Sequence, residues 1–246
     1  KSQSQDYKTG DCFNLRWFSP TVEVPLCGHA TLASAAVLYY VVGNQNECLT
    51  FDTQSGPLRV KKDGNYLCLD MPINKPNILE EDVVEKLHAL IEATIGDLLV
   101  DCVYYSANTR KLLVRLMDST SRSKFEEFHP DFQSMLSSAP PRETIDVRGV
   151  IVTVKGSEEY CNEQGVQFDF VSRYFAPWVG INEDPVTGSA HTVLGSYWSG
   201  VLGKDEMLAR QCSARGGNLR VSILKNARVV VSGDAFVVLR GHIKYS

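Results

Sequence analysis

Apolar residues crowd two stretches of the chain, residues 30–42 and residues 192–198. In both stretches, apolar and small side chains occupy nearly every position instead of forming one stripe with a helical period. A helix that is apolar on all sides is buried on all sides. The pattern therefore predicts two buried helices, one in each half of the chain.

Alternating apolar and polar positions, bounded by glycine, proline and asparagine turns, predict short strands. We expect strands at residues 12–18, 21–26, 47–52, 56–61, 66–71, 98–105, 111–117, 147–154, 167–175, 208–213, 219–224, 227–231 and 235–239. Apolar residues at helical spacing predict an amphipathic helix over residues 79–95, and residues 123–136 also read as helical. Because strands follow each buried helix, we expect an α+β fold with a sheet wrapped round each helix.

Three landmarks occur twice in the same order. They are an Arg-aromatic-Phe-x-Pro segment, a glycine turn before the apolar helix, and a strand containing Leu-Arg-Val, at residues 16–20 and 173–177, 27–31 and 187–191, and 55–60 and 216–221. The first landmark recurs after 157 residues and the third after 161. Nearly constant spacing indicates an internal repeat, so the sequence predicts two similar halves.

The prolines within residues 72–76 mark a linker between the halves. We predict an N-terminal lobe over residues 1–76 and a C-terminal lobe over residues 77–246. The landmark arginine follows 15 residues of the first lobe but 96 residues of the second. The first lobe is therefore expected to be incomplete, with strands and a helix upstream of residue 1, and the initial Lys1 in place of Met agrees with this.

Composition narrows the class of protein. Of 246 residues, 43% are hydrophobic and 22% charged, which is typical of a soluble globular protein, and a net charge of −4 without basic runs argues against nucleic acid. Seven widely spaced cysteines without a C-x-x-C pair favour a reduced, cytoplasmic protein. Residues 30–42 are too short to span a membrane. The oligomeric state stays open, with a homodimer as one assembly considered.

The turn at residues 183–191, E-D-P-V-T-G-S-A-H, is the most informative stretch for chemistry. Pro185 disfavours helix at the preceding residue, while Thr187, Gly188 and Ser189 can begin a helix and leave its first N–H groups free for an anion. The turn therefore predicts a site for a carboxylate ligand.

Two side chains near these turns are candidates for proton chemistry. Asp184, beside a proline, can act as acid, base or hydrogen-bond acceptor, although it or Glu183 can equally cap the helix. His29, which follows Gly28 at the other helix start, can donate a proton or orient an anion, or hydrogen-bond to a strand carbonyl instead. His191 lies further into its helix, where packing is the expected role.

The remaining polar groups limit the reaction class. Ser189 lacks a G-x-S-x-G context, so it suits carboxylate binding better than nucleophilic attack. Cys27 can be an activated thiol at a helix start, but the matching position is Thr187, so two opposed thiols are excluded. The five histidines have no metal-ligand spacing, and no phosphate-binding glycine motif occurs. We therefore expect no metal and no cofactor.

Residues 23–31, 173–177 and 183–190 together closely resemble the phenazine-biosynthesis-like (PhzF-like) isomerase family, and its animal members look nearest. The resemblance runs from about residue 15 to the end of the chain. It implies a diaminopimelate-epimerase-like fold of two pseudo-symmetric domains, each a rolled, mostly antiparallel sheet round a central helix. Both helix N-termini would then point into one cleft.

The resemblance also implies a cofactor-free proton transfer on a cyclic carboxylate. It makes His29 and Asp184 catalytic, and it makes Gly188 and Ser189 ligand-binding residues. We add Gly28 to the ligand-binding residues, because glycine allows close backbone approach at an anion site. The family's glutamate lies in an N-x-S-E-T block, and nothing between Lys1 and residue 18 matches that block. The glutamate is therefore expected upstream of residue 1.

We predict a cofactor-independent isomerase that moves a proton on a small carboxylate metabolite. A second hypothesis is a metabolite-binding or protein-binding regulator that has lost catalysis on the same scaffold. A third is a racemase that uses the single thiol of Cys27.

Overall fold

The computed structural model describes residues 6–18, 22–24 and 26–242. Its strands are β1 (Cys12–Asn14), β2 (Trp17–Phe18), β3 (Glu23–Val24), β4 (Cys48–Thr53), β5 (Gly56–Asp63), β6 (Tyr66–Pro72), β7 (Asn77–Ile78), β8 (Val100–Ser106), β9 (Lys111–Leu116), β10 (Gly149–Lys155), β11 (Phe170–Ala176), β12 (Ile181–Glu183), β13 (Glu206–Gln211), β14 (Gly217–Leu224) and β15 (Arg228–Asp234). The helices are α1 (Gly28–Ala36), the π-helix η1 (Val37–Val42), α2 (Glu81–Lys86), α3 (His88–Ile95), α4 (Arg122–Glu127), α5 (Phe132–Ser137), the 3₁₀ turn η2 (Pro177–Val179) and α6 (Gly188–Leu202).

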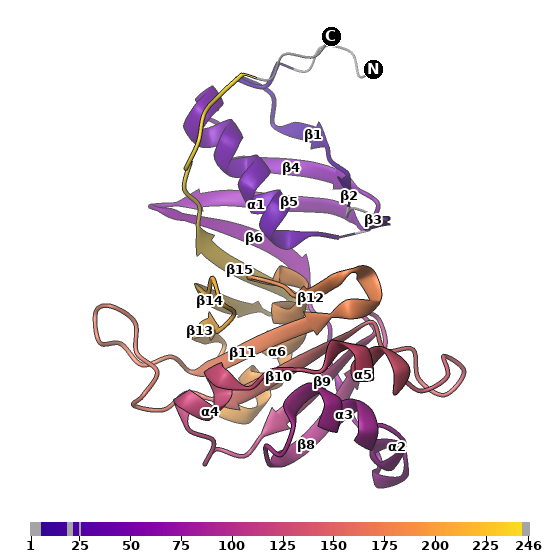
Figure 1. The fold of residues 1–246 in the computed structure, drawn as a ribbon. Helices are drawn as coiled ribbons and strands as arrows, with labels where there is room; N and C mark the ends of the chain where they lie inside the picture. Colours follow the sequence, from indigo (N-terminus) through magenta and orange to yellow (C-terminus); the bar gives the residue numbers. More distant parts are fainter. Residues whose placement is uncertain (1–5, 19–21, 25, 243–246) are drawn as a thin grey trace.

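Within the described residues, one 13-stranded sheet runs through the whole molecule in the order β1-β4-β5-β6-β15-β14-β13-β11-β10-β9-β8-β7, with β12 beside β11. Most neighbours are antiparallel, and the parallel pairs are β1 with β4, β9 with β10 and β11 with β13. Figure 1 shows α1 against the upper strands and α3 and α5 against the lower ones. The sheet is continuous where β6 and β15 pair, so the boundary between residues 1–76 and 77–246 stays a prediction.

The predicted repeat is visible in the topology. In the first half β2 pairs with β3, α1 follows, and β4, β5 and β6 form an antiparallel meander. In the second half β11 pairs with β12, α6 follows, and β13, β14 and β15 form the same meander. The two halves therefore repeat the same order of strands and helix, and they meet where β6 pairs with β15.

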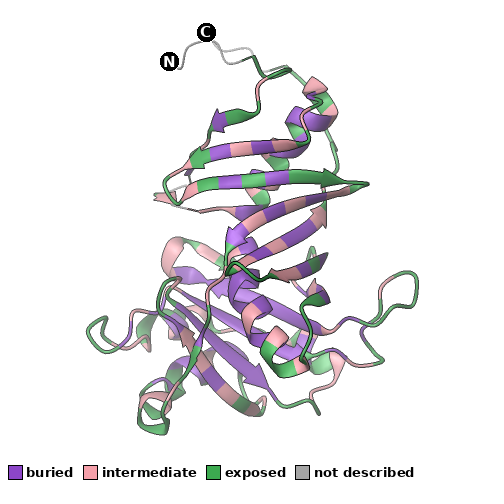
Figure 2. Cartoon of the chain, turned by 180° about the vertical axis from the view of Figure 1, so that it is seen from behind, coloured by how far each residue is buried: buried purple, intermediate pink, exposed green. Residues whose placement is uncertain are grey.

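The two central helices differ in how far they are covered. Nine residues of α6 are buried, among them Trp198 at 0% exposure. The first helix was expected to be buried all round, and that prediction is wrong: Ala33, Val37 and Val41 form an exposed row along α1 and η1. The reason is that β4, β5 and β6 pack against one side of the helix only. Figure 2, seen from behind, shows buried residues alternating with exposed or intermediate ones along these strands.

Two helix predictions need correction. The helix expected over residues 79–95 is divided at Leu87 into α2 and α3, and the one over residues 123–136 is divided into α4 and α5. In the second case Pro130 disfavours helical backbone at the residue before it, and Asp131 caps the new helix through its side chain.

At the two ends of the chain, expected strands are shorter or absent. The strand expected over residues 12–18 is interrupted between β1 and β2, and of residues 21–26 only β3 is a strand, with Thr21 and Pro25 outside the described residues. Residues 235–239 form no strand, and Val238 is 92% exposed. Figure 1 shows this yellow segment running from β15 past the outer side of α1.

Candidate functional site

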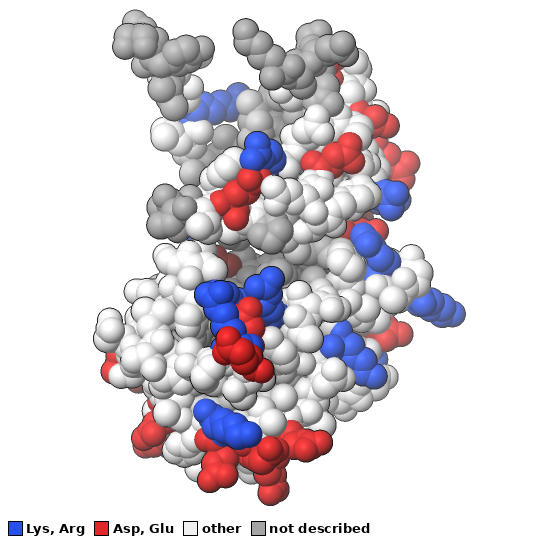
Figure 3. All heavy atoms as spheres, turned by 90° about the vertical axis from the view of Figure 1, so that its right-hand side faces the viewer, with Lys and Arg blue, Asp and Glu red and all other residues white. Residues whose placement is uncertain are grey.

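The N-termini of α1 and α6 touch each other. A Cβ atom built on Gly28 would lie 3.0 Å from the Cα atom of Gly188, and one built on Gly188 would lie 3.1 Å from the Cα atom of Gly28. A side chain at either position would push the two backbones apart, so glycine suits both turns. The anion-ready ends of the two helices therefore lie at one place, and Figure 3 shows the surface hollowed between the upper and lower parts.

The residue before each glycine has an extended backbone and is the N-cap of the helix that follows. Cys27 precedes α1 with φ −140°, and Thr187 precedes α6 with φ −112°. Among the described residues, neither side chain caps its own helix. The first N–H groups of a helix have no intrahelical acceptor, so the amides of Gly188 and Ser189 suit an external anion.

Asp184 is held rigidly at the start of α6. Its side chain is 9% exposed, and its carboxylate accepts a hydrogen bond from the Thr187 hydroxyl. That hydroxyl accepts in turn from Nε2 of Gln211, 3.2 Å away, and the same Nε2 donates to the Asp184 carbonyl at 2.7 Å. The Asp184 N–H donates to the Tyr174 carbonyl at 3.0 Å. Side chain and backbone are thus both fixed.

Neither acidic residue of the turn caps the helix, which was the alternative role for both. Glu183 forms a two-pronged ion pair with Arg173, with Nε–Oε1 and Nη2–Oε2 distances of 2.7 and 3.0 Å. The first half repeats this pair between Arg16 and Glu23, with an Nε–Oε1 distance of 2.7 Å. Each glutamate therefore holds together the two chain segments that precede its turn. Asp184 takes no part in these ion pairs and is available to a ligand.

His29 comes from the first half and reaches the carboxylate of the second. Its Nδ1 atom lies 4.0 Å from Oδ2 of Asp184, and its side chain is 51% exposed. The Sγ atom of Cys27 lies 3.5 Å from its Nε2 atom. The hydrogen bond with Cys27, assisted by the negative charge of Asp184, raises the pKa of His29 above its usual range. The structure therefore joins a half-exposed, readily protonated imidazole to a buried carboxylate.

His191 has no access to this site. Its Nδ1–H donates to the Thr187 carbonyl at 2.8 Å, and its ring is completely buried beside Phe170. Burial lowers the pKa of His191 to about 4, so the ring is neutral. This agrees with the packing role expected from the sequence.

Three further residues near Asp184 were not predicted to belong to the site, namely Gln211, Tyr174 and Lys111. Gln211 ends a strand that was predicted, but nothing in its pattern shows that its amide reaches across to the turn. Lys111 begins β9, where a charged residue in a fully buried strand is the one signal that could have drawn attention to it. It is only 8% exposed.

Two cavities lie away from the meeting point of the two helix N-termini. A cavity of about 310 Å³ between α3 and α4 and one of about 270 Å³ beside Lys62 and Phe236 contain neither His29 nor Asp184. Within residues 6–18, 22–24 and 26–242, no group of three His, Cys, Asp or Glu side chains is arranged to hold a metal ion. In the same part of the chain, no helix has the length and apolar character needed to cross a membrane.

Known proteins resemble this chain over almost its whole length. The family model described as phenazine biosynthesis-like protein matches residues 4–241. A phenazine biosynthesis-like domain-containing protein of Rattus norvegicus is 48% identical over 238 residues, covering 97% of this chain and 80% of the relative. An uncharacterized isomerase of Pseudomonas aeruginosa is 41% identical over 239 residues, with the same shares covered.

A solved structure gives the same result for the fold. The PhzF-family phenazine biosynthesis protein of Enterococcus faecalis has a TM-score of 0.77 and 35% identity, covering 97% of this chain and 80% of that one. This match confirms the predicted fold class, a mixed fold dominated by a mostly antiparallel sheet. With a family model spanning the described site and relatives at more than 40% identity, the chain belongs to the phenazine biosynthesis-like protein family.

Proposed function

We propose that this protein is an isomerase that moves a proton on a small, cyclic carboxylate without a metal or nucleotide cofactor. The observation that carries the proposal is the 4.0 Å approach of His29 to Asp184 at the point where the two helix N-termini meet. An imidazole and a carboxylate from opposite halves, beside free helix amides, provide proton chemistry and anion binding in one place.

The roles of the residues follow from their chemistry. The amides of Gly188 and Ser189, at the start of the 15-residue helix α6, bind the substrate carboxylate, and Gly28 lets the other helix approach. His29, with its raised pKa, donates a hydrogen bond or proton to the developing negative charge. Asp184, fixed through Thr187, accepts the proton that leaves the substrate carbon, and His29 returns a proton to the substrate.

The resemblance assigns the proton transfer itself to a glutamate in an N-x-S-E-T block, and this sequence contains no such block. In this chain we therefore assign the proton-accepting role to Asp184, at the position where the site holds a buried carboxylate. A relative that carries the name isomerase supports the reaction class. We also propose a cytoplasmic location, because the seven cysteines are widely spaced along the sequence and include no C-x-x-C pair.

The test is incorporation of solvent deuterium. The protein is incubated in D₂O with a library of small cyclic carboxylates, and each compound is analysed by mass spectrometry for a gain of one mass unit. An isomerase of this kind catalyses exchange at the carbon that loses its proton. A compound that binds, as shown by shifted amide NMR signals of Gly188 and Ser189, but gains no deuterium favours the binding protein instead.

A further inference from the structure

Lys111 lies on the same face of the sheet as α6. Along β9 the side chains alternate, and Leu113 belongs to the core that packs against α6. Two residues further on, the Arg115 guanidinium lies 4.6 Å from the centre of the Trp198 ring, near the end of α6. By the same alternation, Lys111 lies toward the start of α6, where Asp184 is.

The neighbouring strands fix the position of this lysine. Lys111 is directly opposite Gly149 in the parallel β9–β10 pair. A Cβ atom at Gly149 would collide with the hydroxyl group and ring of Tyr174, so this ring passes over the glycine. The Nζ atom of Lys111 is 5.4 Å from the centre of that ring, and the carbonyl of Tyr174 accepts the N–H of Asp184. Tyr174 thus links the lysine to the aspartate.

The Lys111 ammonium has few other partners. It is buried to 8% exposure, and its hydrogen bond to the Thr109 carbonyl is long, at 3.5 Å. A buried ammonium or carboxylate is costly unless a group of opposite charge lies nearby. Among the described residues, the charge that acts on Lys111 is that of Asp184.

We propose that Lys111 is a positioning residue whose buried ammonium is the internal counter-charge of the Asp184 carboxylate and orients that carboxylate at the start of α6. The inference rests on the proposed function only for the role of Asp184 in the reaction. It assigns the site a second cation besides His29: one half-exposed at the surface, the other buried beneath the carboxylate.

The charge pair between Lys111 and Asp184 is expected to depend on pH. Burial lowers the pKa of Lys111 to about 8, while the charge of Asp184 acts against this decrease. The titratable groups around the pair are Tyr174 on β11, and His29 with Cys27 at the start of α1. Above about pH 8 the lysine loses its proton, and the buried carboxylate then loses its compensating charge.

The test follows the Lys111 side-chain nitrogen by ¹⁵N NMR as the pH is raised, with the signal assigned by through-bond correlation to the backbone. In the native sequence the midpoint is expected about two pH units below that of an exposed lysine. In Asp184→Asn it should fall further by at least about one unit, because the neutral amine is then favoured. Arg115 lies on the same face of β9 as Lys111 and pairs with Asp118. Asp118→Asn removes that pair and should leave the Lys111 midpoint unchanged.

An ordinary lysine midpoint in the native protein, or the same midpoint in native and Asp184→Asn proteins, would overturn the proposal. A shift of equal size in Asp118→Asn would also do so, because the effect would then reflect net charge and not a specific pair. No ligand is used, so the result is independent of the deuterium assay. An absence of deuterium exchange would not contradict the charge pair. An unchanged Lys111 midpoint would not contradict the proposed reaction.

Discussion

Gly28 and Gly188 lie so close that a Cβ atom added to either one would lie 3.0 or 3.1 Å from the Cα atom of the other. Gly28→Ala should therefore force α1 and α6 apart. Overpacking of this kind costs roughly 1–3 kcal/mol, so we expect a free energy of unfolding lowered by about that amount in urea denaturation. Ligand binding should weaken as well, because the two helix ends no longer meet.

The matched control is Gly200→Ala on α6, where an added Cβ atom meets nothing within 4 Å. Alanine in a helix is favoured over glycine by up to about 1 kcal/mol, so this variant should be slightly more stable. Equal stability changes in Gly28→Ala and Gly200→Ala would contradict the close approach of the helices.

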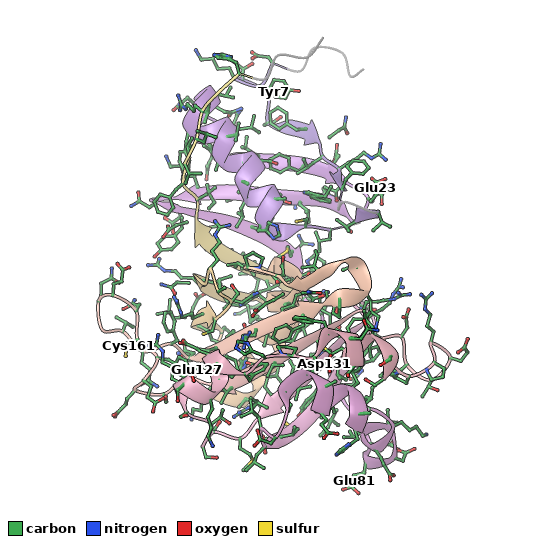
Figure 4. All side chains as sticks on the ribbon, viewed as in Figure 1. Tyr7, Glu23, Glu81, Glu127, Asp131 and Cys161 are labelled. Carbon is green, nitrogen blue, oxygen red and sulfur yellow. The ribbon has the colours of Figure 1, made fainter. Side chains whose placement is uncertain are left out.

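The two arginine–glutamate pairs should differ in their contribution to stability. Arg173 is 6% exposed at its side chain, whereas Arg16 is 63% exposed. Glu183→Gln leaves a buried guanidinium without its partner and should lower the free energy of unfolding by about 2–4 kcal/mol. Glu23→Gln, at the position that Figure 4 labels at the edge of the upper part, should have little effect. A larger loss in Glu23→Gln than in Glu183→Gln would contradict this assignment.

Cys27 should control the protonation of His29. Because the thiol raises the pKa of His29, Cys27→Ala should move the NMR titration midpoint of the His29 ring down toward 6.5. A raised folded-state pKa stabilises the protein below the unfolded value and loses this effect as the pH rises through the folded value. The stability difference between native protein and Cys27→Ala should therefore be larger at about pH 5.5 than at about pH 8.5.

Cys161→Ala provides the comparison, since Cys161 is an exposed thiol on a loop of the lower part, away from α1 (Figure 4). The His29 midpoint should not change in this variant. If it does, or if it stays fixed in Cys27→Ala, the contact between thiol and imidazole does not set the protonation of His29.

His191 should contribute to unfolding in acid. Its folded-state pKa is depressed to about 4 by burial, so between about pH 6.5 and pH 4 the unfolded chain binds a proton that the folded protein does not. Stability should fall over this interval by on the order of 3 kcal/mol from this residue. Urea denaturation of His191→Gln should show a shallower decrease with falling pH, and an unchanged slope would contradict the assignment.

Much of the site could be predicted from local sequence because the repeat places equivalent turns in both halves. Gly28 and Gly188 are each first in a helix that follows an extended segment, and pseudo-symmetric packing of two such units brings the two starts together. The strands β4, β5 and β6 were predicted to within two residues of their ends, since turn residues bound each one.

Other features depend on packing between distant segments and left no local pattern. Lys111 lies 73 residues before Asp184, and only the strand order β9-β10-β11 brings it beneath the turn. The exposed row containing Val37 was missed because an apolar sequence does not show how many sides of a helix the sheet will cover. The break at Leu87 occurs inside a continuous helical pattern, and its bridge-region backbone (φ −95°, ψ −4°) carries no sequence signal.

The most direct measurement is the rate at which the protein incorporates solvent deuterium into a carboxylate that it binds, compared between the native chain, Asp184→Asn, His29→Gln and the surface variant Asp205→Asn. We predict exchange in the native chain and in Asp205→Asn, and a decrease of roughly 100-fold or more in the other two, as is usual when a residue that takes part in proton transfer is removed. Undiminished exchange in Asp184→Asn would contradict it.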